Sequence, residues 1–578
     1  VGLLKALEES GSVSTLPSVS YFPLCFDCST ADTLRAFIAM FRLSKALSTV
    51  RHAVDKGVPS QDRLGVRPAL EVSLMGLRSR LAHVMHEDID NKRHRHRRRH
   101  SSKKGRSGKG KAHETQDAHE TEAEHGEGEG EGEGEGDALP DLGSLPAPPM
   151  PHSQEWGLLC PLTGTPQTLS VSSAPLAQMV DDTQGTGTAM ARDSPYGKAV
   201  CAAPFDALVA EGARVAQALR HIDTRLQYSI SGYKNSWVIK PAGKSRGRGI
   251  FVSDDLQHIC DQVGRPEETF VAQRYVERPL LVHDYKFDIR QWVVVSSLNP
   301  LVIWAYDTPY LRFCSTKFSL EDLDDPSIHL ANNSIQKHLP EYGQDAGITG
   351  EGNMWDWDGF REWVESMGHA EYLKHMGQTQ TEGQAEAEAE GGVYASPESL
   401  IKGLRHRMME IIIASISCGR FDLTCPAEGF EIYGYDFLVD RDMVPWLLEI
   451  NSSPTLEHAT PLVTRHIQRM TKGLVSILVD TQRGLGVKTK ARTGPAFPSI
   501  DAPHLESILE EGAPRDMGGW DLIYKESSKM TCLETAFGLK MGVTGTEIPI
   551  PPIEGQRHRH QPQHHSTHQT GQTGRAQL

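Results

Sequence analysis

Two blocks of the chain, residues 236–340 and 396–485, carry the hydrophobic patterns that can build a folded core. The first block alternates β-branched runs with turns, in the runs WVIK, GIFV, TFVAQRYV, RQWVVV and PLVIWAYD. The second begins with a helical pattern, for which Ser396 is a good N-cap and Pro397 a good first residue. Two strand-like runs follow it, FEIYGYDFLVD and VPWLLEIN. Antiparallel strands next to helices predict an α+β or mixed α/β domain.

Low-complexity sequence surrounds these blocks and sets the expected domain boundaries. Only 38% of the 578 residues are hydrophobic and the net charge is −15, so long solvated stretches are expected. A basic run followed by Gly-Glu alternation cannot bury a core. The expected organisation is a helix-rich region at 1–88, a disordered basic and acidic linker at 89–152, a connecting region at 153–235, the main domain at 236–485 with a low-complexity insertion at about 341–394, and a mostly disordered extension at 486–578.

Composition also argues against several classes of protein. No apolar run reaches the roughly 18 residues that cross a membrane, so no membrane partner is expected. The basic block from Lys92 to Lys111 contains no aromatic residues that stack on bases, so nucleic acid is not the expected partner. That block is either a solvated, nuclear-import-like linker or a docking arm for an acidic polymer. Cys25 and Cys28 form a lone C-x-x-C, which indicates core thiols rather than a zinc site. The sequence begins at Val1, so we expect it to be a fragment.

The stretch WVIKPAGKSRGRGIFV, residues 237–252, places glycines and cations between two strands. Glycine lets backbone amides approach a ligand closely, and successive amides form a concavity for anions. Lys240, Lys244, Arg246 and Arg248 add positive charge there. The stretch therefore predicts a phosphate cradle, with a basic surface hairpin as the alternative. The Walker A spacing is absent.

A second stretch, residues 269–295, combines a possible adenine hinge with a charged strand. The run from Phe270 to Val276 supplies backbone donors and acceptors of the kind that adenine recognition needs. In the following strand, alternation places Lys286, Asp288 and Arg290 on one face. Because the adjoining run is strongly apolar, this face is expected to border a cleft.

A third stretch, GYDFLVDRDMVPWLLEINSSPT, predicts a metal site. If Arg441-Asp442 is a two-residue hairpin turn, Asp436 lies across from Leu447. Glu449 and Asn451 have the same parity as Leu447, so all three polar groups share a face. Two carboxylates and an amide are oxygen ligands suited to Mg²⁺, which keeps waters and also binds substrate phosphates. The alternative is a pair of edge-strand acids in water.

Together the three stretches predict an ATP–Mg²⁺ site built on two sheets. Their ordered motifs, K-P…S-R-G-x-G-I, Q-x-Y…P-L-L…K-F-D-I-R, Y-L-R-F, I-H-L-x-N-N, G-x-D-F and L-x-E-I-N-x-S-P, resemble those of the tubulin–tyrosine-ligase-like family over about half of the chain. The runs KFDIRQW, STKFS and IHLANNSIQK are similar to its glycine-ligating branch, the tubulin monoglycylases. The resemblance implies an ATP-grasp-like fold with the nucleotide between two sheets.

The same resemblance implies roles for individual residues. Lys240 and Lys286 contact the ATP phosphates, and Arg246 lies near the γ-phosphate. The adenine hinge comprises Gln273 and the backbone of Arg274, Tyr275 and Val276. Asp288 faces the ribose or the substrate.

On the substrate side, Arg290 and Arg312 hold a carboxylate of the acceptor or of the incoming amino acid. Asn332 lies near the active site, although Ala331 beside it departs from the residues common in the family. The implied Mg²⁺ ligands are Asp436, Glu449 and Asn451.

The resemblance further implies an ATP-dependent, Mg²⁺-dependent ligase that joins glycine to glutamate side chains of acidic tubulin tails through an acyl phosphate. The implied protein is a monomer of the cytoplasm and cytoskeleton, including the axoneme of the cilium or flagellum. Two alternatives stay open. One is a glutamate ligase of the same family, a tubulin polyglutamylase. The other is a non-catalytic microtubule-binding protein, against which the filled positions Lys240, Lys286, Asp436 and Glu449 argue.

Overall fold

The structure is a computed structural model that describes residues 20–104, 145–151, 153–156, 158–160, 190–244, 246–263, 268–343, 348, 352–367, 396–420, 430–484, 517–526, 530–534 and 540–544. For residues 87–104, 478–484, 530–534 and 540–544 only the backbone is described. Strands β13 (Met530–Glu534) and β14 (Lys540–Thr544) pair with each other in a second unit that begins at Ser528. No described helix is both long and apolar enough to span a bilayer.

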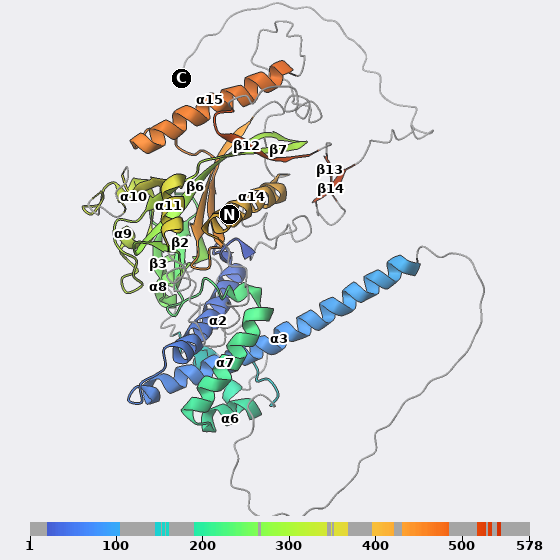
Figure 1. Cartoon of the computed structure of the whole chain (residues 1–578). Helices are drawn as coiled ribbons and strands as arrows, with labels where there is room; N and C mark the ends of the chain where they lie inside the picture. The colour runs from blue at the N-terminus through green and yellow to red at the C-terminus, as the bar shows by residue number, and fades with distance from the viewer. Residues whose placement is uncertain are drawn as a thin grey trace, which may run out of the picture. The chain divides into compact units, whose positions relative to one another are not determined.

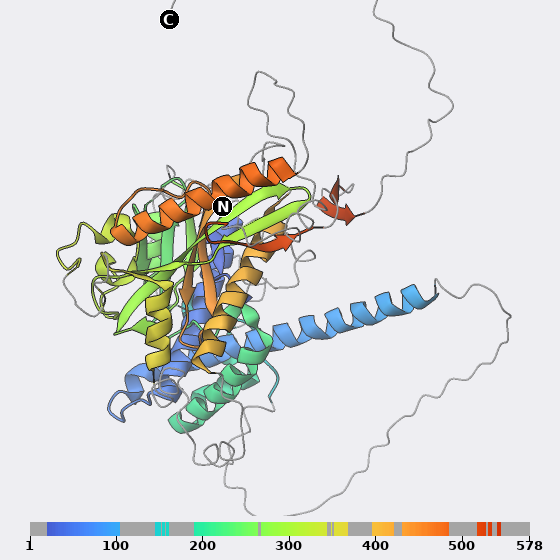
Figure 2. The same cartoon turned by 45° about the horizontal axis from the view of Figure 1, so that its top comes forward.

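Three long helices pack against one another near the N-terminal end of the first unit (Figures 1 and 2). They are α2 (Ala31–Asp55), α3 (Arg63–Lys104) and α7 (Phe205–Ile222), accompanied by α4 (Ser153–Trp156), η3 (Ala191–Asp193), α6 (Pro195–Ala202) and η4 (Thr224–Leu226). Gly212 of α7 allows the close approach to α2, because a Cβ there would lie 2.8 Å from Val50 Cγ1. The predicted linker boundary at residue 88 is not a helix end. The Lys and Arg residues beyond it are good helix formers, and α3 continues to Lys104.

A four-stranded antiparallel sheet joins this helical region to the main domain. Its strand order is β1 (Cys25–Asp27), β4 (Phe270–Arg274), β2 (Trp237–Pro241) and β3 (Phe251–Ser253), with α8 (Leu256–Val263) after β3. The residues around Cys25 belong to this sheet, a strand that the predicted helix-rich region at 1–88 did not include. The two thiols of the C-x-x-C are buried, and no described cluster of His, Cys, Asp or Glu could hold a metal there.

The second sheet has eight strands and carries most of the motifs that the sequence analysis singled out. Its main path is β11 (Pro445–Asn451), β10 (Glu431–Val439), β6 (Tyr285–Leu298), β7 (Leu301–Tyr306) and β12 (Trp520–Lys525). Off this path lie β5 (Leu281–Val282), β8 (Tyr310–Phe313) and β9 (Met354–Asp356). The short helices α9 (Pro326–His329) and α10 (Asn333–Gln336) follow β8 in the chain.

The two faces of β6 pack against different helices. Phe287 and Ile289 lie in a core with α14 (Pro397–Gly419) and α11 (Trp357–Ser366). Trp292, on the opposite face, lies in a core with α15 (Pro461–Gly484). The cartoons accordingly show α14 and α15 on opposite sides of the sheet (Figures 1 and 2). The architecture confirms the predicted α+β class.

The N-terminus of α14 confirms one local prediction. The Ser396 side chain accepts a hydrogen bond from the Ser399 amide and caps α14, with Pro397 as its first residue. Within the predicted low-complexity insertion, Trp357 and Phe360 of α11 are buried in the core, so this part of the insertion is folded.

The β10–β11 hairpin differs from its predicted register. Asp436 faces Glu449 rather than Leu447, and Gly434 faces Asn451. Two features cause the shift. The turn is longer than two residues, because the buried Asp440 carboxylate accepts hydrogen bonds from the amides of Asp442 and Val444. A bulge also follows Asp436. The two carboxylates still share a face.

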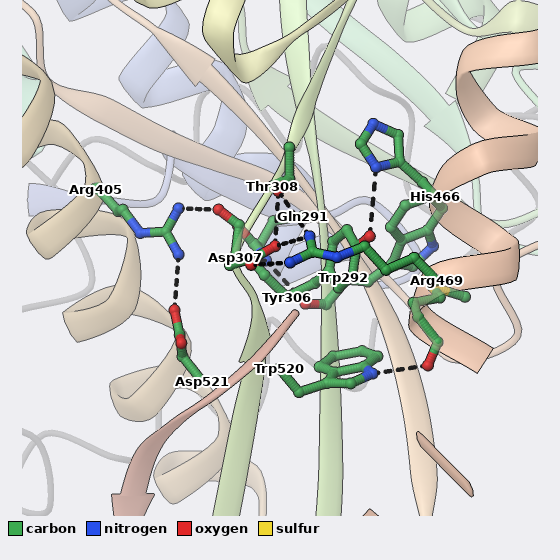
Figure 3. Close-up of polar contacts among 11 residues, drawn as sticks. Gln291, Trp292, Tyr306, Asp307, Thr308, Arg405, His466, Arg469, Trp520 and Asp521 are labelled. Carbon is green, nitrogen blue, oxygen red and sulfur yellow. Dashed lines mark hydrogen bonds and ion pairs between the residues drawn. The ribbon is translucent and has the colours of Figure 1, made fainter. Parts of the chain in front are cut away.

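Strand β12 closes the far edge of the large sheet and is held from several sides (Figure 3). The Trp520 indole donates a hydrogen bond to the Met470 carbonyl of α15 at 2.9 Å. Asp307, at the end of β7, accepts two hydrogen bonds of 2.7 Å from the Arg469 guanidinium. Its amide donates to the Gly519 carbonyl at 2.7 Å. A segment that follows α15 in the chain is thus part of the sheet.

Candidate active site

A cavity lies between the two sheets. The small sheet contributes residues of β2 and β4, the large sheet contributes β6, β10 and β11, and residues 329–332 close one side. Nine predicted site residues line the cavity: Lys240, Gln273, Arg274, Tyr275, Val276, Lys286, Asp288, Asp436 and Glu449. The cavity also brings in Asn332 and an apolar set that the sequence analysis did not single out: Val238, Ile250, Leu330, Leu438 and Leu448. An apolar slot with polar groups at its ends suits a purine ring.

The β4 end of the cavity carries a free acceptor. Gln273 is buried, and its Oε1 has no hydrogen-bond partner among the described residues. The neighbouring Arg274 side chain points out of the site, donating to Ser231 Oγ at 3.0 Å and to Ser44 Oγ and lying 4.9 Å from the Trp237 ring. Burial lowers the pKa of Arg274 to about 10. Only the backbone of Arg274 is therefore placed for a role in the hinge.

Lys286 lies in a buried pocket of aromatic and carbonyl groups. Its ammonium donates to the His329 carbonyl and lies 4.8 Å from the Tyr275 ring centre. Burial lowers the Lys286 pKa. His329 was missed by the sequence analysis, although it lies in the I-H-L-x-N-N motif. Its Nδ1 is 2.8 Å from the Tyr275 hydroxyl and its Nε2 is 2.7 Å from the Asp322 carbonyl. Two ring contacts and a bound lysine make it a support for the cavity wall.

The opposite end of the cavity is acidic. Asp436 and Glu449 are cross-strand neighbours, and the Asn451 amide donates to Glu449 Oε1 at 3.2 Å and to Asp436 Oδ2 at 3.4 Å. Burial raises the Glu449 pKa, and the charge of Asp436 raises it further. At Asp436 burial acts in the same direction, but two arginines outweigh it and hold the pKa well below its usual range. The three predicted metal ligands are thus together.

Two arginines and two aspartates form a buried network beside this acidic end. Arg290 donates to both oxygens of Asp436, at 2.5 and 3.1 Å. Arg312 donates to both oxygens of Asp288, at 2.6 and 2.7 Å, and forms an ion pair with Asp436 at 3.0 Å. Burial would lower the Arg312 pKa, but the two carboxylates raise it well above its usual value. Both predicted substrate-binding arginines are therefore engaged by carboxylates of the protein and do not line the cavity.

The glycine-rich loop folds as a tight turn near this cavity. Its backbone is left-handed at Arg246, Gly247 and Gly249, with φ of 62°, 73° and 74°. Arg246 is not among the residues that line the cavity, and its carbonyl accepts a hydrogen bond from Ser334 at 3.1 Å. Lys240, at the start of the loop, lies in the cavity wall with its ammonium 3.4 Å from the Leu448 carbonyl. Of the predicted phosphate contacts, Lys240 and Lys286 are placed together.

The donor set fits the groups that the sequence predicts. The orphaned Gln273 Oε1 matches an exocyclic adenine amine, and the apolar walls match its ring. Two carboxylates and an amide match Mg²⁺, which completes its shell with waters and phosphate oxygens. The described residues contain no cluster of three or more His, Cys, Asp or Glu side chains that could hold a metal.

Comparison with known proteins covers the same part of the chain. Residues 208–390 and 364–484 match the model of the tubulin-tyrosine ligase family. The chain is similar to protein monoglycylase TTLL8 of Mus musculus, at 36% identity over 259 residues, 44% of this chain and 28% of that protein. It is similar to tubulin monoglycylase TTLL3 of Homo sapiens, at 32% identity over 307 residues, which cover 50% of this chain and 36% of that protein. Tubulin glycylase 3A of Drosophila melanogaster is 34% identical over 257 residues, which cover 44% of this chain and 23% of that protein. These alignments span only about a third or less of each relative.

Proposed function

We propose that this chain, whose residues 208–484 match the model of the tubulin-tyrosine ligase family, is an ATP-dependent ligase that attaches glycine to glutamate side chains of tubulin tails. One observation supports this most directly. The cations Lys240 and Lys286 and the acids Asp436 and Glu449 come from two different sheets and line one cavity. The names of the relatives, which are monoglycylases or glycylases, favour glycine as the amino acid that is joined.

The proposed reaction forms a C–N bond in two steps. ATP transfers its γ-phosphoryl group to a glutamate side-chain carboxylate, which yields an acyl phosphate and ADP. The glycine amine then attacks the acyl carbon, phosphate leaves, and an isopeptide bond remains. No protein nucleophile is needed, because positioning and charge stabilisation supply the catalysis.

The residues of the cavity have separate tasks in this scheme. Gln273 and the backbone of residues 274–276 bind the adenine, and Lys240 and Lys286 neutralise the phosphates. Asp436, Glu449 and Asn451 would hold Mg²⁺, which would supply charge stabilisation for the transferred phosphoryl group. Asp288 faces the ribose or the substrate through the network that also holds Arg312. Arg290 and Arg312, which the structure pairs with Asp436, would orient a substrate carboxylate at this end of the site.

Labelled substrates test the proposal. The full chain is incubated with Mg-ATP, tubulin and either labelled glycine or labelled glutamate. We expect incorporation of glycine alone, and incorporation of glutamate alone would identify a polyglutamylase instead. In parallel, Glu449→Gln should abolish incorporation and leave tubulin binding unchanged. Glu457→Gln, an exposed site in the segment after β11, is the matched control and should be active. Tubulin binding without any ATP-dependent incorporation by the wild-type chain would overturn the proposal.

The proposed setting follows from the same relatives. Tubulin tails are acidic, so the partner is the microtubule, and the place of action is the cytoplasm and cytoskeleton, including the axoneme of the cilium or flagellum. The enzyme is proposed to act as a monomer. The side chains of the basic block at Lys92–Lys111 lie outside the described residues, so its docking role remains a prediction.

A further inference from the structure

A short segment near the N-terminal end of the described chain connects the two sheets that form the cavity. Residues 20–28 precede the family match, which begins at residue 208. The Tyr21 carbonyl accepts a hydrogen bond from the Leu447 amide of β11, in the large sheet, at 2.7 Å. The Leu24 carbonyl accepts one from the Arg274 amide of β4, in the small sheet, at 2.8 Å. Strand β1 then continues along β4, with Cys25 opposite Gln273.

We call residues Tyr21–Leu24 the strap. Three residue steps separate its two anchoring carbonyls, and a fully extended chain covers at most about 10 Å in three steps. Pro23 fixes one backbone angle within the strap. At one end the Tyr21 side chain is completely buried in the core that contains Leu447. The strap is therefore a short spacer with both ends attached.

A single side chain holds the middle of the strap. Gln227 is buried, and its Oε1 accepts from the Leu24 amide at 2.8 Å while its Nε2 donates to the Phe22 carbonyl at 2.9 Å. Its own backbone is left-handed, with φ of 43°, at the end of η4. A left-handed backbone costs free energy at a residue other than glycine. The two side-chain hydrogen bonds offset this strain.

The anchoring points are immediate neighbours of cavity residues. Arg274 follows Gln273, whose free Oε1 lies at the proposed adenine end. Leu447 precedes Leu448 and Glu449, which lie at the apolar wall and the acidic end. The strap thus connects β4, which carries the proposed adenine hinge, to β11, which carries the acidic end. It thereby limits the distance between these two strands.

We propose that the strap, clamped by Gln227, sets the separation of the two sheets and thereby the affinity of the cavity for a nucleoside triphosphate with its divalent cation. Gln227 is then a positioning residue, since it does not line the cavity. This inference rests on the proposed function, because it assumes that the cavity binds Mg-ATP. It gives residues 21–24, which precede the family match by more than 180 residues, a role in nucleotide binding.

The test measures Mg-ATP binding to the full chain by calorimetry, with unfolding midpoints recorded separately. Gln227→Ala is expected to weaken Mg-ATP binding about tenfold, which is the scale that the loss of one or two hydrogen bonds can produce. Pro23→Gly loosens the strap and leaves both hydrogen bonds of Gln227 in place. It is expected to weaken Mg-ATP binding in the same direction, and it serves if Gln227→Ala does not fold. In ligation assays the KM for ATP should rise while the KM for glycine is unchanged.

Arg80→Ala is the matched control. Arg80 Nε contacts Asp223 Oδ2 at 2.7 Å and ties α3 to the turn that carries Gln227, but it does not touch the strap. It should lower stability and leave Mg-ATP affinity at the wild-type value. Wild-type affinity in both strap variants, with only their unfolding midpoints lowered, would overturn the inference and leave the proposed function intact. A wild-type chain that binds no Mg-ATP would overturn both.

Discussion

His329 should make the stability of the fold depend on pH between about 4 and 6.5. Its Nε2 faces the Asp322 carbonyl, so Nε2 carries the proton and Nδ1 accepts from the Tyr275 hydroxyl. Both ring nitrogens are therefore used by the neutral ring. Burial lowers the His329 pKa to about 4, and the Lys286 ammonium nearby acts in the same direction.

The sign and size of the effect follow from linkage. An unfolded histidine titrates near 6.5, whereas the folded one titrates near 4, so the unfolded chain binds the extra proton first. The contribution of His329 to the free energy of unfolding is complete above about pH 6.5 and is lost as the pH falls toward 4. At pH 5.5 the free energy of unfolding should be lower by about 1 kcal/mol than at pH 7.5, and the full loss is about 3 kcal/mol.

Urea unfolding of the full chain at pH 7.5 and 5.5 measures this difference. The chain contains 26 histidines, so a comparison with His329→Phe isolates the contribution of one of them. The variant should be less stable than wild type at pH 7.5, because it leaves the Tyr275 hydroxyl without this acceptor. Its pH dependence should be smaller by about 1 kcal/mol. An identical pH dependence in the two proteins would show that His329 is not held neutral by the fold.

Three further predictions concern other parts of the chain. Asp288→Asn removes one of the two carboxylates that pair with the buried Arg312 and should lower the free energy of unfolding by roughly 3–5 kcal/mol in urea titrations. An unchanged midpoint would mean that Asp436 alone is enough to neutralise Arg312. Gly434→Ala places a Cβ 3.0 Å from Pro454 Cβ and 3.3 Å from Arg290 Nη1, so the guanidinium must shift. Glycine incorporation should then fall at least tenfold, by roughly the 1.4 kcal/mol that tenfold represents, while circular dichroism stays native. Deleting residues 92–111 should weaken microtubule binding at low salt in cosedimentation, and a salt profile equal to that of wild type would remove the docking-arm reading.

Much of the site could be predicted because its residues follow strand alternation. Lys286 and Asp288 share a face of β6 and line the cavity, as a period of two requires. Asp436 and Glu449 came together even though the hairpin register was wrong. The bulge and the longer turn shift the pairing without changing which face the two carboxylates occupy.

Contacts between distant segments could not be predicted in the same way. The engagement of Arg290 and Arg312 with Asp436 depends on the register between β6, β8 and β10, which only the folded sheet fixes. The Arg274 side chain turns toward Ser44 in α2, a partner 230 residues away in the sequence. His329 carries no periodic signal, because it ends a helix of four residues. Strand β1 was missed for a similar reason, since three residues are too few for a pattern.

The attachment of β12 has a practical consequence. The family match ends at residue 484, yet the sheet takes its last strand from residues 520–525. A fragment that ends at residue 484 would leave β7 as an unpaired edge strand. The backbone of Val302–Tyr306 could then pair with strands of neighbouring molecules. The domain that contains the family match is thus not continuous in sequence. An expression fragment should retain Glu526, whose carboxylate forms an ion pair at 2.5 Å with Arg420, the residue after α14.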